Sequence, residues 1–359
     1  MIMILFTALS SYDTLPLNLS MIVAHRSHRS SLPKKLESRF KLRWIEVDRF
    51  GDITHSLHLD DVPNEGYEVS PDGSKLVTGV ATGSKCTIRI FDRSGKSRAT
   101  SLMIDPKTFY YVAFKWSPSS RSLCVELGRQ QDLRTVRPKG YMVPTTRDFI
   151  IFNEELKRQT SLLSQSYETT AQWNANDQLW ITSPATALNA LPKPFVRKKV
   201  SVAALGWFQH LLSPDGSLTV TPYNKVIDGN GRGDVLSRNS IVESYLWQDK
   251  ETLVFSTRAF GNFPRRGTMS LQRRQWNSTT GTLSPTEVLY RAPAAWGEFE
   301  FDCFLAPKAC VNGGIVTLTT DTSFGDRVEF HKDGLPIPLF HLKDRNFRIR
   351  RLVALQPKN

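Results

Sequence analysis

The sequence VSPDGSKLVTG, from Val69 to Gly79, decides the fold, because its core recurs as LSPDGSLTV from Leu212 to Val220. In each copy Pro presets φ at the first corner of a tight turn, Asp bonds nearby backbone, and Gly accepts a positive φ. Alternating apolar residues flank both turns, which predicts a strand, a turn and a second strand. A third, divergent copy, WSPSSRSLCVEL, begins at Trp116. A recurring hairpin indicates a repeat protein.

Three weaker copies of the repeat also place an apolar residue just before a polar turn, the slot for an apolar anchor: WNANDQLWIT, WQDKETLVFST and LAPKACVNGGIVTLT. The apolar anchors, in chain order, are Val69, Trp116, Trp173, Leu212, Trp247 and Leu305. Successive anchors stand 47, 57, 39, 35 and 58 residues apart, which brackets the period of about 40 to 50 residues of known propeller blades. Two unrelated hairpins that share a common turn are the alternative, and the weaker copies count against it.

These repeats resemble those of TolB-like propellers and of the propeller domains in prolyl-oligopeptidase relatives, where SPDG is followed by Leu. The run IRIFD, from Ile88 to Asp92, resembles the strand that ends in Trp-Asp in WD-repeat proteins, with Phe91 in the Trp place. The resemblance covers residues 40–359 and implies a divergent β-propeller of no particular subfamily. The Gly-His pair of WD repeats is missing, and three of the six slots keep Ser-Pro.

Ring closure predicts the number of blades. A propeller avoids exposed sheet edges by sealing one blade with strands from both ends of the chain. FRIRRLVALQ, from Phe347 to Gln356, predicts a lone inner strand, and LSMIVAH, FKLRWIEVDRFGD and ITHSLHL near the N-terminus supply its partners. We therefore predict an all-β propeller of seven four-stranded blades. Six blades are the alternative, because the segment from Ala187 to Ser201 fits no strand pattern.

Length and composition are those of one closed unit. We assign residues 1–39 to an N-terminal tail or linker that contributes one closing strand, and residues 40–359 to a single, monomeric propeller domain. No segment approaches the run of about 18 apolar residues that a membrane span needs. The apolar head MIMILFTALS lacks the positive leader of a signal peptide. The four cysteines form no metal-binding pattern, so a cytoplasmic location is favoured and secretion is the alternative.

The chain is basic, with 47 Lys and Arg against 34 Asp and Glu, a formal net charge of +13 and a pI near 9.6. Such an excess raises affinity for polyanions through phosphate contacts and counterion release. The candidate binding residues lie in three clusters: Lys193, Arg197, Lys198 and Lys199; Arg265, Arg266, Arg273 and Arg274; and Arg348, Arg350 and Arg351. An RNA or an acidic protein would fit them, and a solvated basic surface is the plain alternative.

Signatures of catalysis and of cofactor binding are missing from the sequence. It contains no Gly-x-Ser-x-Gly elbow, no Walker loop, no His-Glu-x-x-His and no Cys-x-x-Cys. The loop DGNGRGD resembles the oxygen-rich loops that hold calcium in some propellers, with Asp228, Asn230 and Asp234 as its ligands. Arg232 stands where a further oxygen ligand belongs and would repel the ion. We therefore expect no cofactor and no metal.

These observations favour a non-catalytic platform that binds another protein through the loops of one propeller face. Binding of RNA or another polyanion through the basic clusters is one alternative. A propeller hydrolase or lyase, with its site centred on the channel, is the other, since the fold alone does not fix function.

Overall fold

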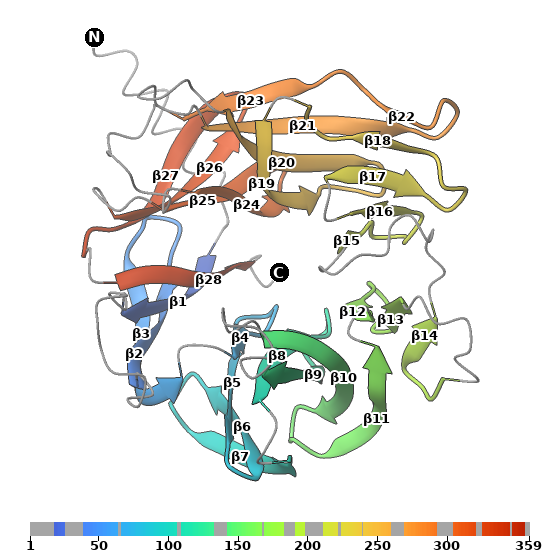
Figure 1. Cartoon of the computed structure of the whole chain (residues 1–359). Helices are drawn as coiled ribbons and strands as arrows, with labels where there is room; N and C mark the ends of the chain where they lie inside the picture. The colour runs from blue at the N-terminus through green and yellow to red at the C-terminus, as the bar shows by residue number, and fades with distance from the viewer. Residues whose placement is uncertain are drawn as a thin grey trace.

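The computed structural model describes residues 18–25, 39–63, 66–105, 109–132, 142–166, 169–182, 191–197, 211–221, 224–238, 240–259, 269–292, 304–320, 325–344 and 347–355. Every regular element in these stretches is a β-strand. No helix able to span a membrane occurs in them. The strands form seven sheets that succeed one another around a central axis (Figure 1). The predicted all-β propeller of seven blades is confirmed, and the six-bladed alternative is wrong.

Blades 1 to 3 run in chain order from the centre of the ring outwards (Figure 1). Their strands are β4 (Tyr67–Val69), β5 (Lys75–Thr82), β6 (Lys85–Asp92) and β7 (Ser97–Met103) in blade 1; β8 (Phe109–Trp116), β9 (Ser122–Asp132), β10 (Met142–Asn153) and β11 (Arg158–Ser166) in blade 2; and β12 (Thr170–Trp173), β13 (Leu179–Thr182) and β14 (Phe195–Arg197) in blade 3.

Blade 3 departs from the regular pattern. It has three described strands, and β14 pairs with β13 in parallel over three residues. A strand this short shows no apolar alternation, which is why the segment from Ala187 to Ser201 fitted no strand in the sequence.

Blades 4 to 6 repeat the plan, and blade 5 gains an extra strand because β22 and β23 both pair with β21. Their strands are β15 (Leu211–Leu212), β16 (Leu218–Val220), β17 (Lys225–Asp228) and β18 (Gly233–Val235) in blade 4; β19 (Ser240–Trp247), β20 (Thr252–Ala259), β21 (Met269–Asn277), β22 (Thr282–Leu283) and β23 (Glu287–Arg291) in blade 5; and β24 (Phe304–Val311), β25 (Gly314–Thr320), β26 (Asp326–Lys332) and β27 (Leu335–Leu342) in blade 6.

Blade 7 closes the ring with strands from both ends of the chain, as predicted. Its order from the centre is β28 (Phe347–Leu355), β1 (Asn18–His25), β2 (Arg39–Val47) and β3 (Ile53–Pro63). Strands β28 and β1 are antiparallel, with Asn18 opposite Leu355 and His25 opposite Phe347. They lie side by side in Figure 1 as the red and the blue strand. The first and last strands therefore share one ladder of backbone hydrogen bonds.

The SPDG turn of blade 1 is held by a buried serine. The Ser70 hydroxyl donates to Asp72 Oδ1 at 2.6 Å and accepts the Lys75 N–H at 2.9 Å. Asp72 Oδ1 also accepts the Ser74 N–H at 3.0 Å, and Gly73 has a φ of 67°. The sequence analysis attributed the turn to its Pro, Asp and Gly residues. The structure shows that Ser70, which is fully buried, also bonds to Asp72 within the turn and to Lys75 after it.

The turn of blade 4 repeats this geometry. The Ser213 hydroxyl donates to Asp215 Oδ1 at 2.7 Å and accepts the Leu218 N–H at 3.0 Å. Asp215 Oδ1 accepts the Ser217 N–H at 3.0 Å, and Gly216 has a φ of 70°. The two copies of the Ser-Pro-Asp-Gly tetrapeptide thus form the same hydrogen-bonded turn, which is why the repeat could be recognised in the sequence.

Blade 6 uses a different turn, and the predicted anchor there is wrong. Leu305 lies at the start of β24, whereas Val311 ends the strand and pairs with Gly314 across the turn. The turn residues Asn312 and Gly313 have φ values of 48° and 76°, which suits a tight two-residue hairpin. The segment Ala-Pro-Lys after Leu305 lies within β24 and forms no turn.

A pair of glycines in blade 4 tests the turn. Gly216→Ala is expected to lower the free energy of unfolding by about 1–2 kcal/mol, because a Cβ strains a left-handed residue. Gly229→Ala is the control, since an added Cβ there meets open space and no positive φ is required; it should be neutral or slightly stabilising. Urea unfolding followed by tryptophan fluorescence measures both. Equal losses in the two variants would contradict the assignment.

Candidate functional site

The innermost strands are tied to one another at the end where the turns lie. The tryptophan that ends an innermost strand donates its indole N–H to a backbone carbonyl of the preceding blade. These bonds, with their Nε1–O distances, are Trp116 to Glu68 (3.4 Å), Trp173 to Lys115 (2.8 Å) and Trp247 to Leu211 (3.4 Å). In each case the acceptor is the residue just before the anchor of the previous repeat.

Blade 4 has Leu212 in the anchor slot and makes this link in another way. The Gln172 side chain donates from Nε2 to the Leu212 carbonyl and accepts the Leu212 N–H at Oε1, both at 3.0 Å. The side-chain amide therefore takes the place of the indole bond at the junction of blades 3 and 4. Every blade junction from blade 1 to blade 5 thus has a hydrogen bond at its inner end.

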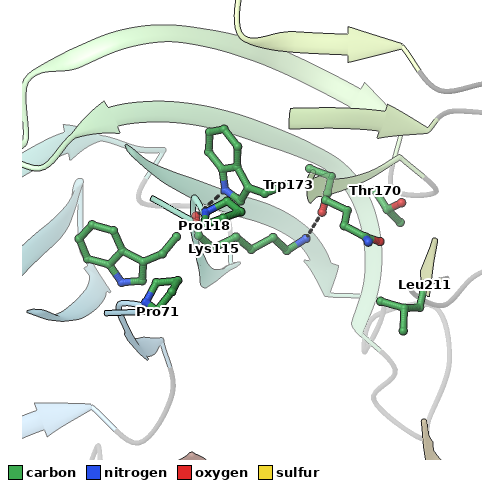
Figure 2. A pocket seen from close by; sticks show the side chains of 9 residues that line it. Pro71, Lys115, Pro118, Thr170, Trp173 and Leu211 are labelled. Atoms are coloured by element: carbon green, nitrogen blue, oxygen red, sulfur yellow. Dashed lines mark hydrogen bonds between the residues drawn. The ribbon is translucent and has the colours of Figure 1, made fainter. Parts of the chain in front are cut away.

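A pocket of about 520 Å³ opens at this inner rim (Figure 2). Residues from four consecutive blades line it: turn prolines from blades 1 and 2, tryptophans from blades 2 and 3, and Leu211 from blade 4. The lining residues with most bearing on binding are Pro71, Lys115, Trp116, Pro118, Trp173 and Leu211. The wall is mainly apolar, and Lys115 supplies its one charged side chain among the described lining residues.

Lys115 reaches a buried carboxylate behind the pocket. Glu126 on β9 has 0% of its side chain exposed, and Lys115 Nζ lies 3.1 Å from its Oε2. Arg147 Nη1 lies 3.1 Å from Oε1, and the Tyr111 hydroxyl donates to Oε1 at 2.7 Å. Lys115 also donates to the carbonyl of Ala171 at 2.8 Å, as Figure 2 shows.

The charges around Glu126 keep it ionised. Burial alone would raise the pKa of Glu126, but the positive charges of Lys115 and Arg147 outweigh it and hold that pKa below its ordinary value. Burial and the neighbouring carboxylate raise the pKa of Tyr111. A carboxylate that is buried and bound by three donors has no access to a ligand. The cluster therefore fixes a cation at the pocket wall and offers no general base.

Charged residues also stand at bulges on the innermost strands of blades 5 to 7. Glu243, Lys308 and Arg350 each fall at a shift of register, where the strand has one residue more than its partner. A bulge redirects a side chain out of the regular alternation. Glu243 is bound by Arg258 at 2.6 Å. Lys308 and Arg350 are exposed.

The predicted basic residues that the structure describes lie on three separate blades. Those with described side chains are Lys193, which is exposed beside β14 in blade 3; Arg273 and Arg274 on β21 in blade 5; and Arg348, Arg350 and Arg351 on β28 in blade 7. Lys198, Lys199, Arg265 and Arg266, and the side chain of Arg197, lie outside the described residues.

Several of these arginines are bound within the fold. Arg273 forms a two-point ion pair with Glu287, at 2.9 and 2.8 Å. Arg274 donates to backbone carbonyls of blades 4 and 5, including that of Val235 at 2.6 Å. Arg348 pairs with buried Asp326, and Arg351 Nε lies 2.9 Å from Glu68 Oε2. Binding of a partner through these residues stays a prediction.

The loop considered for calcium is held by its own arginine. Asp228 Oδ2 lies 2.8 Å from Arg232 Nε, and Asp228 Oδ1 accepts the N–H groups of Asn230 and Arg232. Arg232 also donates to the carbonyl of Ser278 at 2.8 Å, which ties blade 4 to blade 5. In the part of the chain that the structure describes, no group of three His, Cys, Asp or Glu residues could hold a metal ion.

The pocket itself was not predicted. The sequence marked Trp116 and Trp173 as inward anchors of their repeats, but not as walls of a common cavity. The available signal was the recurrence of tryptophan at the same slot in successive repeats. Lys115 gave no signal, because its partners Glu126 and Ala171 come from another strand and another blade.

No protein-family model matches the sequence, and no curated protein matches it either. Solved structures do resemble the fold. TolB from Acinetobacter baumannii aligns with a TM-score of 0.43 and 14% identity over 95% of this chain and 67% of its own. An acylaminoacyl peptidase aligns with a TM-score of 0.46 and 12% identity, over 84% and 48%. AztD from Citrobacter koseri aligns with a TM-score of 0.40 and 7% identity, over 96% and 99%.

The chain is a seven-bladed β-propeller protein, on the evidence of its own sheet order and register. The present chain spans about half the length of the peptidase that it resembles.

The Glu126 cluster predicts a pH dependence. Because the native pKa of Glu126 lies below its ordinary value near 4.5, its contribution to stability is complete above that value and is lost as the pH falls through the native pKa. Glu126→Gln should lower the free energy of unfolding by about 3 kcal/mol at pH 7, because buried Arg147 and partly buried Lys115 both lose their counter-charge. The difference from the wild-type protein should shrink below pH 4.5.

Glu154→Gln is the control for this measurement. Glu154 pairs with Lys75 at 2.6 Å but is 48% exposed, so its loss should cost less than about 1 kcal/mol. Urea unfolding at neutral and acidic pH compares the variants. A difference for Glu126→Gln that does not change with pH would contradict the assignment.

Proposed function

We propose that the protein is a non-catalytic platform that holds a partner protein, with one anchor residue of the partner inserted in the pocket at the inner rim. The observation that carries this proposal is the set of tryptophan and proline walls contributed by four consecutive blades. Aromatic-lined pockets of this kind take the anchor side chains that dominate binding energy at protein interfaces.

The rigidity of the walls supports the proposal. Trp173 is fixed by its bond to the Lys115 carbonyl, and Gln172 is fixed by two bonds to Leu212. Side chains that are already ordered lose little entropy when a ligand binds. A volume of about 520 Å³ also lies within the range of natural ligand pockets.

The chemistry of the lining supports a binding role over catalysis. The described residues around the pocket include no Asp, Glu, His or Cys, and the nearby Glu126 is buried behind Lys115. Acid–base catalysis needs a titratable group within hydrogen-bonding reach of the substrate. A channel-centred enzyme and a polyanion-binding protein are the alternatives that the following experiment separates.

Three prolines in equivalent turns provide the test. Pro71 and Pro118 line the pocket, whereas Pro214 holds the same position in the turn of blade 4 and does not line it. Pro71→Glu and Pro118→Glu are expected to weaken partner capture at least about tenfold, which is the loss of one well-packed contact worth about 1.4 kcal/mol. Pro214→Glu, with the same change of charge on the same kind of exposed turn, should keep it.

Capture is measured from native lysate with the immobilised protein, with and without nuclease. A protein retained by the wild type and by Pro214→Glu, but lost from both pocket variants, supports the proposal. Capture that all three variants share would contradict the pocket as the binding site. Nuclease-sensitive capture would favour the polyanion alternative, and turnover of a glycoside, ester or lactone substrate would favour the enzyme.

A further inference from the structure

The pocket wall carries an excess of positive charge. Lys115 and Arg147 both pair with Glu126, so two cations share one carboxylate. Arg147 is buried, whereas 25% of the Lys115 side chain is exposed, and Lys115 lines the pocket. The excess positive charge is therefore accessible to a ligand at Lys115, which faces the pocket.

Lys115 has a hydrogen-bond donor left for a ligand. An ammonium group has three N–H bonds. One is directed to Glu126 Oε2 and one to the carbonyl of Ala171, which leaves the third for the pocket. Two fixed bonds hold Nζ in place, as Figure 2 shows for the bond to Ala171. A donor held in this way loses little freedom on meeting an acceptor.

The surroundings of Lys115 strengthen its attraction for an anion. Trp116, Trp173, Pro71 and Leu211 make the neighbouring wall apolar, and a charge pair in such surroundings is less screened than one in water. A ligand that fills this pocket must therefore present an apolar group and a negative charge at short separation. The C-terminal residue of a polypeptide does so, because its side chain and its α-carboxylate belong to one residue.

We propose that the pocket binds the free C-terminus of a partner chain, with an apolar or aromatic last side chain between the tryptophan and proline walls and the α-carboxylate on Lys115 Nζ. This inference rests on the proposed platform function. It adds the part of the partner that binds and the residue that selects it. An acidic side chain within a chain is the competing source of the carboxylate.

Three small probes test the inference on the intact protein. Acetyl-Pro-Phe with a free carboxylate is compared with its C-terminal amide, and acetyl-Asp-Phe amide carries the negative charge on a side chain instead. Tryptophan fluorescence and calorimetry measure binding at millimolar probe concentrations. The free acid is expected to bind about tenfold more tightly than the amide, equivalent to about 1.4 kcal/mol. The Asp-containing amide should bind like the neutral amide.

Variants assign the preference to Lys115. Lys115→Met should make the free acid and the amide bind equally, whereas Lys115→Arg should keep a preference for the acid. Lys85→Met removes the same charge from an exposed site on β6 and should leave the preference unchanged. The comparison of acid with amide on the wild-type protein needs no variant, so it decides the matter even if Lys115→Met fails to fold.

Equal binding of the acid and the amide would overturn the inference, as would a preference that survives Lys115→Met or the failure of all three probes to bind. Binding of the Asp-containing amide as tightly as the acid would overturn the assignment to a C-terminus. In each of these cases the platform proposal is still tested separately by the proline variants. Failure of the C-terminus inference and failure of the platform proposal are therefore distinguishable.

Discussion

The hydrogen bond from an indole N–H to the preceding blade is the interaction on which the inner rim depends. Each blade is a sheet with two faces to bury, and packing between neighbouring sheets supplies most of that burial: Val77 and Ile88 of blade 1, for example, share a cluster with Phe114 and Val125 of blade 2. The hydrophobic effect that drives this packing is non-directional. A directed bond such as Trp173 to Lys115 fixes the height of one innermost strand against the next.

Once the innermost strands are fixed, the positions of their side chains determine the pocket and its charge. Holding β12 against β8 brings the Ala171 carbonyl to Lys115 Nζ and leaves a gap between the two indoles. The cost of placing Glu126 out of water is offset by three donors, and the carboxylate holds the Lys115 ammonium in place. Under the proposed function, the residues that form the binding surface would also maintain the fold.

The sequence predicted the bonded turns and, from the need to seal the ring, the closing blade. It missed the side-chain contacts that join different strands and blades. The turns at Ser70 and Ser213 could be recognised in the sequence because the bonds from these two serines join residues at most five positions apart. The turn after Val311 was misplaced because a different two-residue geometry replaces the tetrapeptide. Neighbouring arginines such as Arg273 and Arg274 form one cluster in the sequence, yet they bind different partners in the fold. Lys115 gains its role from Glu126 and Ala171, which no spacing rule connects.

The ladder between β28 and β1 has a consequence for how the chain reaches its native state. Because Asn18 lies opposite Leu355, that blade cannot form on the ribosome until β28 has emerged. Pairings between such distant segments slow folding. Until β28 is available, the edge of β1 that faces it has no hydrogen-bond partner. The same adjacency of first and last strands suits circular permutation, with new ends placed between two other blades.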